Sequence, residues 1–143
     1  MTGVQTCALP ISIVAHEYLG ESVEGKTVFI ADDIIASGES MLEVAKELKE
    51  RGAKHIIANA TFPLFTSGLE KFDKAVADGV LTAVLGTNMT YHMPELDTRD
   101  WFFEVDCSKY TAYIVAAINH EMPVSSIIDP IKKIEALLNK HTK

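Results

Sequence analysis

Two adjacent aspartates followed by a turn of small, hydroxyl-bearing residues are the part of this sequence best suited to chemistry. An apolar run at residues 27–31 precedes Asp32 and Asp33, and apolar residues recur at helical spacing over residues 41–48. This pattern predicts a strand that ends at the two acids, then a loop, then a helix. The unbonded N–H groups and the dipole of that helix end would favour an anion at residues 37–40. The sequence therefore predicts a phosphate site beside a carboxylate pair.

The carboxylate pair itself has two readings. At the carboxyl end of a parallel strand, Asp32 and Asp33 would lie where open α/β sheets bind ligands, and their oxygens could hold Mg²⁺ or sugar hydroxyls. The alternative is an ordinary strand that runs into a capped helix, with Asp33 as a turn residue. The Ser37 and Ser40 hydroxyls, which would add donors for a phosphate, favour the first reading.

Strand and helix patterns alternate along the rest of the chain. Further strands are predicted at residues 54–60, 80–85 and 101–105, and the helices between them are predicted to end at Gly52 and Gly79. Such alternation predicts right-handed crossovers. The expected fold is an α/β open parallel sheet with helices on both faces.

Two more helices are predicted after the last strand. One begins near Ser108, and the other begins after Asp129 and Pro130, which suit the N-cap and first position of a helix. The first helix should bury an apolar stripe made of Tyr110, Ile114, Ala117 and Ile118. The second helix should face a partner with the apolar stripe Ile131, Ile134, Leu137 and Leu138.

The composition of the chain limits the classes of partner that it is expected to bind. The 143 residues are 48% hydrophobic and carry 13 Lys and Arg against 20 Asp and Glu, a net charge of −7. A net negative charge argues against nucleic acid or an anionic membrane as a default partner, and no apolar run approaches the length of a membrane span. Cys107 lies apart from Cys7, and the histidines lack metal-ligand spacing. We therefore expect no disulfide, no zinc site and a cytoplasmic protein.

Residues 2–11 resemble the in-frame translation of a sequencing-library adapter. Residues 1–11 are accordingly expected to carry no fold information, and residues 12–143 to form one partial domain with a helical tail at 129–143. On this reading the chain is a piece of a longer protein.

The loop resembles the ribose 5-phosphate loop of the type I phosphoribosyltransferase fold. That pattern is an apolar strand, two acids, two apolar residues, a small residue, Thr or Ser, Gly, a small residue and Thr or Ser. Its matching positions here are Asp32, Asp33, Ala36, Ser37, Gly38 and Ser40. Glu39 replaces the usual glycine, and its side chain is expected to point into solvent.

A wider resemblance, over about residues 13–127, is to the C-terminal part of the ribose-phosphate pyrophosphokinase family. The segments that carry it are Glu24 to Thr27, Leu48 to Lys54, Ala60 to Phe65, Thr87 with Asn88, and Val124 to Ile127. Phe62 stands where the family usually has His. Thr87 and Asn88 could meet a ligand or form a turn, and His16 should run near the family's catalytic loop.

The resemblance implies transfer of pyrophosphate from MgATP to the C1 hydroxyl of ribose 5-phosphate. Residues 37–40 would hold the 5-phosphate, and Asp32 and Asp33 would bind the ribose hydroxyls directly or through Mg²⁺. The ATP half of the site is expected to be missing, so this piece should be inactive alone, whereas the full-length enzyme should be a homo-oligomer. The alternatives are a purine or pyrimidine phosphoribosyltransferase, a non-catalytic regulatory homologue, and a phosphoacceptor receiver domain; the last needs an Asp that the strand at 54–60 does not supply.

Overall fold

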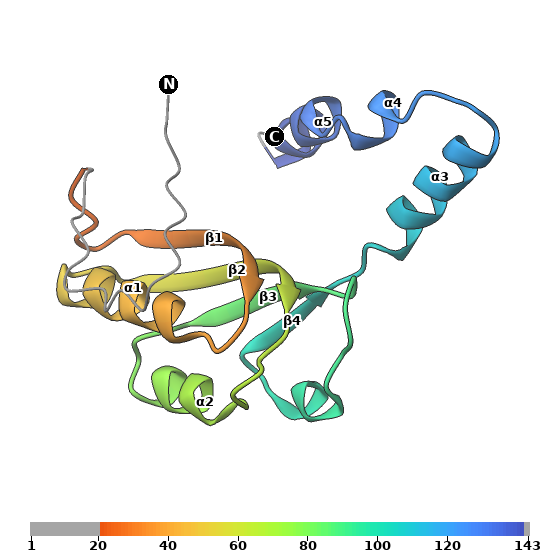
Figure 1. Ribbon diagram of the computed structural model, residues 1–143. Coiled ribbons are helices and arrows are strands. Elements are labelled where there is room, and N and C mark those ends of the chain that lie inside the picture. Colours follow the sequence, from red (N-terminus) through yellow and green to blue (C-terminus); the bar gives the residue numbers. More distant parts are fainter. Residues whose placement is uncertain (1–20, 142–143) are drawn as a thin grey trace, which may run out of the picture.

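A parallel four-stranded sheet forms the centre of the protein in the computed structural model, which describes residues 21–141 (Figure 1). Its strands are β1 (Thr27–Ile35), β2 (His55–Pro63), β3 (Ala83–Thr87) and β4 (Phe102–Val105), and they lie side by side in chain order. The connections contain α1 (Glu39–Glu50), α2 (Glu70–Ala77) and the 3₁₀ helix η1 (Pro94–Thr98). The predicted parallel α/β class is confirmed.

The helices α1 and α2 cover one face of the sheet (Figure 1). Right-handed crossovers between strands that follow one another in a single direction all fall on the same side, and helices change sides only where the strand order reverses. No reversal occurs among the described strands. The two crossover helices of residues 21–141, α1 and α2, therefore lie on the same face and not one on each face (Figure 1), while Phe29 and Phe103 on the other face are 58% and 54% exposed.

Strand β1 runs further than the sequence pattern indicates. The predicted end was Ala31, but pairing with β2 continues through Ile34 opposite Phe62 to Ile35 opposite Pro63. The backbone groups of this stretch gain ladder partners from β2, and this outweighs the low strand preference of aspartate. The two acids thus lie inside the strand rather than at its end.

The core lies between α1, α2 and the covered face of the sheet. Helix α1 buries three residues at helical spacing, and the sheet contributes small and branched residues beneath them. An aromatic cluster closes the core at α2: the Phe72 ring meets Phe65 edge-on with centroids 4.9 Å apart and stacks on Trp101 at 5.8 Å. Edge-to-face and stacked pairs are the favoured aromatic geometries.

The predicted helix end at Gly52 is confirmed in detail. Gly52 has φ 89°, and its N–H and that of Ala53 donate to the carbonyls of Lys49 and Leu48 at 3.0 and 3.1 Å. This is the Schellman arrangement, which requires a left-handed residue after the last helical turn. Helix α2 likewise ends just before Gly79, as predicted.

Three helices follow the sheet: α3 (Ser108–Asn119), α4 (Ser125–Ile128) and α5 (Ile131–His141). The prediction of a buried stripe on α3 is wrong for most of its members, because only Ala117 is buried and Ile118 is 66% exposed. The reason is positional: α3 leaves the carboxyl edge of the sheet instead of lying on a face, and α4 and α5 follow it (Figure 1). Among the described helices, none is long and apolar enough to cross a membrane.

A polar cluster joins α2 to the segment before β4. Asp73 accepts hydrogen bonds from Arg99 Nε at 2.9 Å and from Trp101 Nε1 at 2.7 Å. The Arg99 hydrogen bond lowers the pKa of the Asp73 carboxyl, burial opposes this, and the Trp101 bond lowers the pKa further. A carboxyl whose pKa is lowered by folding contributes stability above its unfolded pKa of about 3.9, and this contribution is lost as the pH falls through the folded pKa.

Replacing Asp73 with Asn should therefore lower the free energy of unfolding at neutral pH by about 1 kcal/mol, a figure that allows for solvent screening of a half-exposed pair. It should also flatten the loss of stability below about pH 4. Urea titrations at several pH values, followed by the fluorescence of Trp101, the one tryptophan, measure both effects. Asp78→Asn is the control, since it removes a carboxylate next to the same helix and leaves the Arg99 and Trp101 contacts in place. Equal acid profiles for the two variants would contradict the assignment.

Candidate phosphate site

The loop between β1 and α1 has a glycine at its turn for two reasons. Gly38 is the residue before the helix and has φ 79°, and its carbonyl accepts the first helical hydrogen bond from Leu42 N at 2.9 Å. A Cβ at this position would also overlap the Phe72 ring of α2, which is fully buried. The backbone of the loop thus lies directly on the aromatic core.

A second segment holds the start of the loop from the other side. The N–H groups of Leu64 and Phe65 both donate to the Ile35 carbonyl, at 2.9 and 3.1 Å, and Thr66 N donates to the Ala36 carbonyl at 2.9 Å. Phe65 has φ 46°, a left-handed conformation that a bulky residue rarely adopts. Its ring is buried against Phe72, so the packing that supports the loop also holds this conformation.

The loop encloses a small polar cavity of about 120 Å³. Its lining comes from the end of β1, the loop and the first turn of α1: Asp32, Ile34, Ile35, Ala36, Ser37, Gly38, Glu39, Ser40 and Met41. Within residues 21–141 the N–H groups of Gly38, Ser40 and Met41 have no hydrogen-bond acceptor, while Glu39 N has only the Ser37 hydroxyl at 3.4 Å. Unbonded amides at a helix N-terminus form an anion site by the direction of their dipoles.

The two carboxylates take different places. Both side chains are exposed, but Asp32 lines the cavity and accepts a hydrogen bond from Asp33 N at 2.8 Å, whereas Asp33 lies outside the cavity lining. Successive side chains of a strand point to opposite faces, which accounts for the difference. In the described part of the chain no three acids, histidines or cysteines come together as a metal cage. A carboxylate pair still fits Mg²⁺, which is often held by one or two carboxylates together with water and ligand oxygens.

Glu39 is neutralised by a residue that sequence reasoning missed. Lys71 Nζ of α2 lies 2.5 Å from Glu39 Oε1, and this hydrogen bond, with the charge of Lys71, lowers the pKa of the Glu39 carboxyl. The expected exposure of Glu39 is observed, but its charge is paired. Lys71 lies 32 residues further along the chain, so no local pattern connects the two. An anion in the loop would meet a neutral pair instead of a free carboxylate.

Thr87 and Asn88, the other candidates for ligand contact, form hydrogen bonds to distant parts of the chain. The Thr87 hydroxyl donates to the Thr61 carbonyl at 2.6 Å, and the Asn88 amide donates to Asp106 Oδ1 at 2.8 Å and accepts from Cys107 N at 2.8 Å. These bonds fix the start of α3 to the end of β3. His16 lies outside the described residues, as do residues 2–11.

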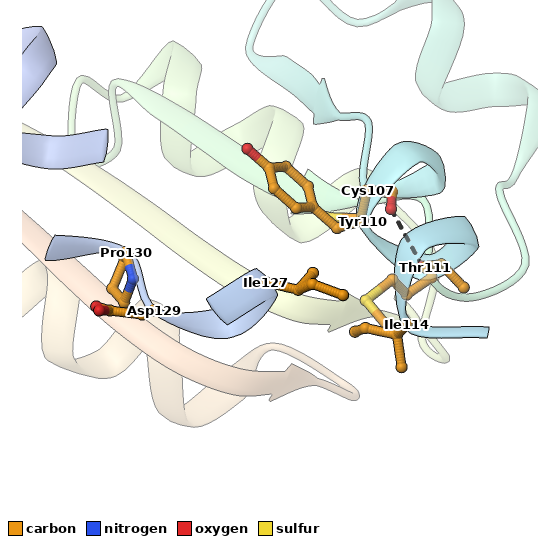
Figure 2. A pocket seen from close by; sticks show the side chains of 8 residues that line it. Cys107, Tyr110, Thr111, Ile114, Ile127, Asp129 and Pro130 are labelled. Atoms are coloured by element: carbon orange, nitrogen blue, oxygen red, sulfur yellow. Dashed lines mark hydrogen bonds between the residues drawn. The ribbon is translucent and has the colours of Figure 1, made fainter. Parts of the chain in front are cut away.

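A larger cavity of about 320 Å³ has a different character. It lies between α3 on one side and α4 with the residues that follow it on the other, where Tyr110, Ile114 and Ile127 supply apolar surface and Asp129 a carboxylate (Figure 2). Its lining offers no cation and no row of unbonded amides, so it lacks the donors that a phosphate needs. The smaller cavity at the loop is therefore the better phosphate site.

The sequence of this chain is similar to those of several known proteins. Residues 5–86 match the phosphoribosyl transferase domain family. The chain is 41% identical over 69 residues to a ribose-phosphate pyrophosphokinase of Pyrococcus abyssi, covering 48% of this chain and 24% of that protein. It is 29% identical over 107 residues to the Vibrio cholerae ribose-phosphate pyrophosphokinase, covering 75% and 33% of the two chains. An orotate phosphoribosyltransferase of Oceanobacillus iheyensis is 46% identical over 52 residues, covering 36% and 24%.

Solved structures share the fold. The phosphoribosylpyrophosphate synthetase of Mycobacterium smegmatis superposes with a TM-score of 0.60 at 24% identity, over 71% of this chain and 33% of that one. The chain thus spans about a quarter to a third of the length of these relatives. With the family match over residues 5–86 and the loop geometry at residues 32–41, the chain belongs to the phosphoribosyl transferase domain family.

Proposed function

We propose that this chain binds ribose 5-phosphate through the loop at residues 32–41, as part of a ribose-phosphate pyrophosphokinase. The observation that carries the proposal is the cavity in which unbonded amides of Gly38, Ser40 and Met41 lie beside the Asp32 carboxylate. Amides and hydroxyls suit a phosphate, whereas a carboxylate suits sugar hydroxyls or a cation. A sugar phosphate presents both groups on one small molecule.

In the reaction proposed for the whole protein, the sugar's C1 hydroxyl attacks the β-phosphorus of ATP and AMP leaves. The loop amides with the Ser37 and Ser40 hydroxyls would hold the 5-phosphate, and Asp32 and Asp33 would hold the ribose diol or Mg²⁺. Bound Mg²⁺ supplies neutralising charge for the phosphates. The contribution of this loop is positioning, which sets the direction of the attacking hydroxyl.

A base phosphoribosyltransferase is the second candidate, favoured by the 46% identity to the orotate enzyme. That similarity extends over 52 residues, whereas the similarity to the Vibrio cholerae pyrophosphokinase extends over 107. The longer match favours the pyrophosphokinase. Both candidates use a 5-phosphoribosyl group, so the loop would do the same work in either.

Replacing Ser37 and Ser40 together with Ala should weaken binding of ribose 5-phosphate at least tenfold, since each lost hydrogen bond to a charged group contributes about 1.5–3 kcal/mol. Binding of ribose without the phosphate should not change. Isothermal titration calorimetry with both sugars measures the difference. Ser67→Ala, at an exposed serine before α2, is the control. If the paired substitution costs ribose as much as ribose 5-phosphate, the loop is not a phosphate site.

Replacing Asp32, the carboxylate of the pair that lines the cavity, with Asn should distinguish the contact with a cation or sugar diol from the contact with the phosphate. This change keeps the shape of the side chain and removes a charge, so the enhancement of ribose 5-phosphate binding by Mg²⁺ should fall, while the affinity for inorganic phosphate stays within about twofold. Titrations with and without Mg²⁺ test this. A wild-type-like Mg²⁺ enhancement in both Asp33→Asn and Asp32→Asn would remove the two acids from the site.

Replacing Gly38 with Ala tests the contact between loop and core. Gly79 is the matched control, because it also has a positive φ, of 69°, but an added Cβ there meets nothing within 4 Å. In both alanine variants the free energy of unfolding should fall by about 1 kcal/mol, because alanine is disfavoured in the left-handed backbone conformation. Gly38→Ala should lose a further 1–3 kcal/mol, roughly, because the Phe72 ring cannot move away within the packed cluster. Equal losses in urea unfolding would show that the Phe72 contact does not restrict the loop.

A further inference from the structure

The first residue of α1 carries a negative charge next to the place where the phosphate is proposed to bind. Glu39 lines the cavity at the loop, and it also lines a groove of about 380 Å³ between α1 and α2. An acid in the first turn of a helix is attracted to the partial positive charge of the helix N-terminus, as a phosphate is. An unpaired Glu39 carboxylate would therefore compete with the ligand for this helix end and would repel it.

Lys71 of α2 holds that carboxylate. Its Nζ atom lies 2.5 Å from Glu39 Oε1, and this hydrogen bond, with the charge of Lys71, lowers the pKa of the Glu39 carboxyl. Lys71 lines the groove but not the cavity at the loop. The two side chains are 48% and 63% exposed, and an exposed ion pair contributes little to the stability of a fold. The effect of the pair is therefore expected in the charge that the loop presents to an anion.

The packing of α2 places Lys71 opposite Glu39. The ring of the next residue, Phe72, is fully buried and lies against the backbone of Gly38, the residue before Glu39. The residue after that, Asp73, is bonded to the segment before β4. These two contacts prevent α2 from turning about its axis. The same aromatic core that supports the loop thus positions the lysine that pairs with it.

We propose that Lys71 is a positioning residue of the phosphate site: by pairing with Glu39 it keeps a carboxylate away from the loop amides, and so raises the affinity of the loop for an anion. In this role Lys71 acts through Glu39 and does not bind the phosphate itself. The inference rests on the proposed function, because it concerns the same loop. It adds to the site a residue that lies 32 positions after Glu39.

Isothermal titration calorimetry of the full chain with ribose 5-phosphate and with inorganic phosphate tests this role. Lys71→Met removes the charge and the hydrogen bond but keeps the length of the side chain. Both anions should then bind at least about fivefold more weakly at low ionic strength, and the difference should shrink as salt is added. Lys71→Arg keeps the positive charge and should restore most of the affinity. If Lys71→Met does not fold, Lys71→Gln replaces it.

Lys74→Met is the matched control. Lys74 lies on the same helix and lines the same groove, so this variant has the same net charge as Lys71→Met and leaves the Glu39 pair in place. It should bind both anions within about twofold of the wild-type chain, because a distant exposed charge is screened. Circular dichroism and urea unfolding show that each variant is folded.

A double-mutant cycle with Glu39→Gln separates positioning from direct attraction. If Lys71 acts through Glu39, Lys71→Met should weaken binding by less than about twofold when Glu39→Gln is also present, because no carboxylate remains to be released. A lysine that attracts the phosphate itself gives the same loss with and without Glu39→Gln. The cycle therefore reports the coupling between the two side chains and not the charge of either one.

Failure of this inference and failure of the proposed function give different results. A wild-type chain that binds neither anion contradicts the proposed function, and the inference with it. A wild-type chain that binds both anions, with Lys71→Met no weaker than Lys74→Met, overturns the inference alone. Equal losses from Lys71→Met with and without Glu39→Gln also overturn it, since Lys71 then acts on the phosphate directly.

Discussion

The close approach of the Gly38 backbone to the Phe72 ring is the constraint on which the site depends. Phe72 belongs to a buried aromatic cluster with Phe65 and Trp101, and this cluster limits how closely the loop backbone can approach the core. Phe65 in turn places its own N–H and that of Leu64 on the Ile35 carbonyl. The loop that directs amides into the cavity is thus held by side chains from a different part of the chain. A loop that is held in place in this way would spend little free energy on ordering when it binds the proposed phosphate.

Electrostatics around the loop are local, because the chain as a whole carries a charge of −7. A phosphate gains nothing from the long-range field of such a protein, so attraction must come from donors within hydrogen-bond distance. Two features remove local repulsion. Glu39 is paired with Lys71, and Asp33 lies outside the cavity lining. Asp32 is the one carboxylate of the pair at the cavity, where a cation or the hydroxyls of a sugar can meet it.

The two faces of the sheet differ in how much of their apolar surface is buried. On the covered face, α1 and α2 bury a continuous core from Met41 to Trp101. Within residues 21–141, apolar residues on the other face of the sheet, such as Phe29 and Phe103, and along α5, such as Ile131 and Leu137, remain exposed. Because hydrophobic burial is the main favourable term in folding, the covered face contributes more to the stability of the sheet than the exposed face does.

The sequence by itself determined the order of the main strands and helices and the position of the loop between β1 and α1, because periodicity and helix-ending glycines such as Gly52 act over a few positions. It also indicated the family. It could not determine that β1 continues to Ile35, since that depends on pairing with β2, nor that Glu39 meets Lys71 across 32 residues. The stripe predicted to be buried on α3 shows the same limit, because periodicity shows which residues share a face but not whether anything packs against it. Tertiary structure decided these points, since each depends on contacts between residues far apart in the chain.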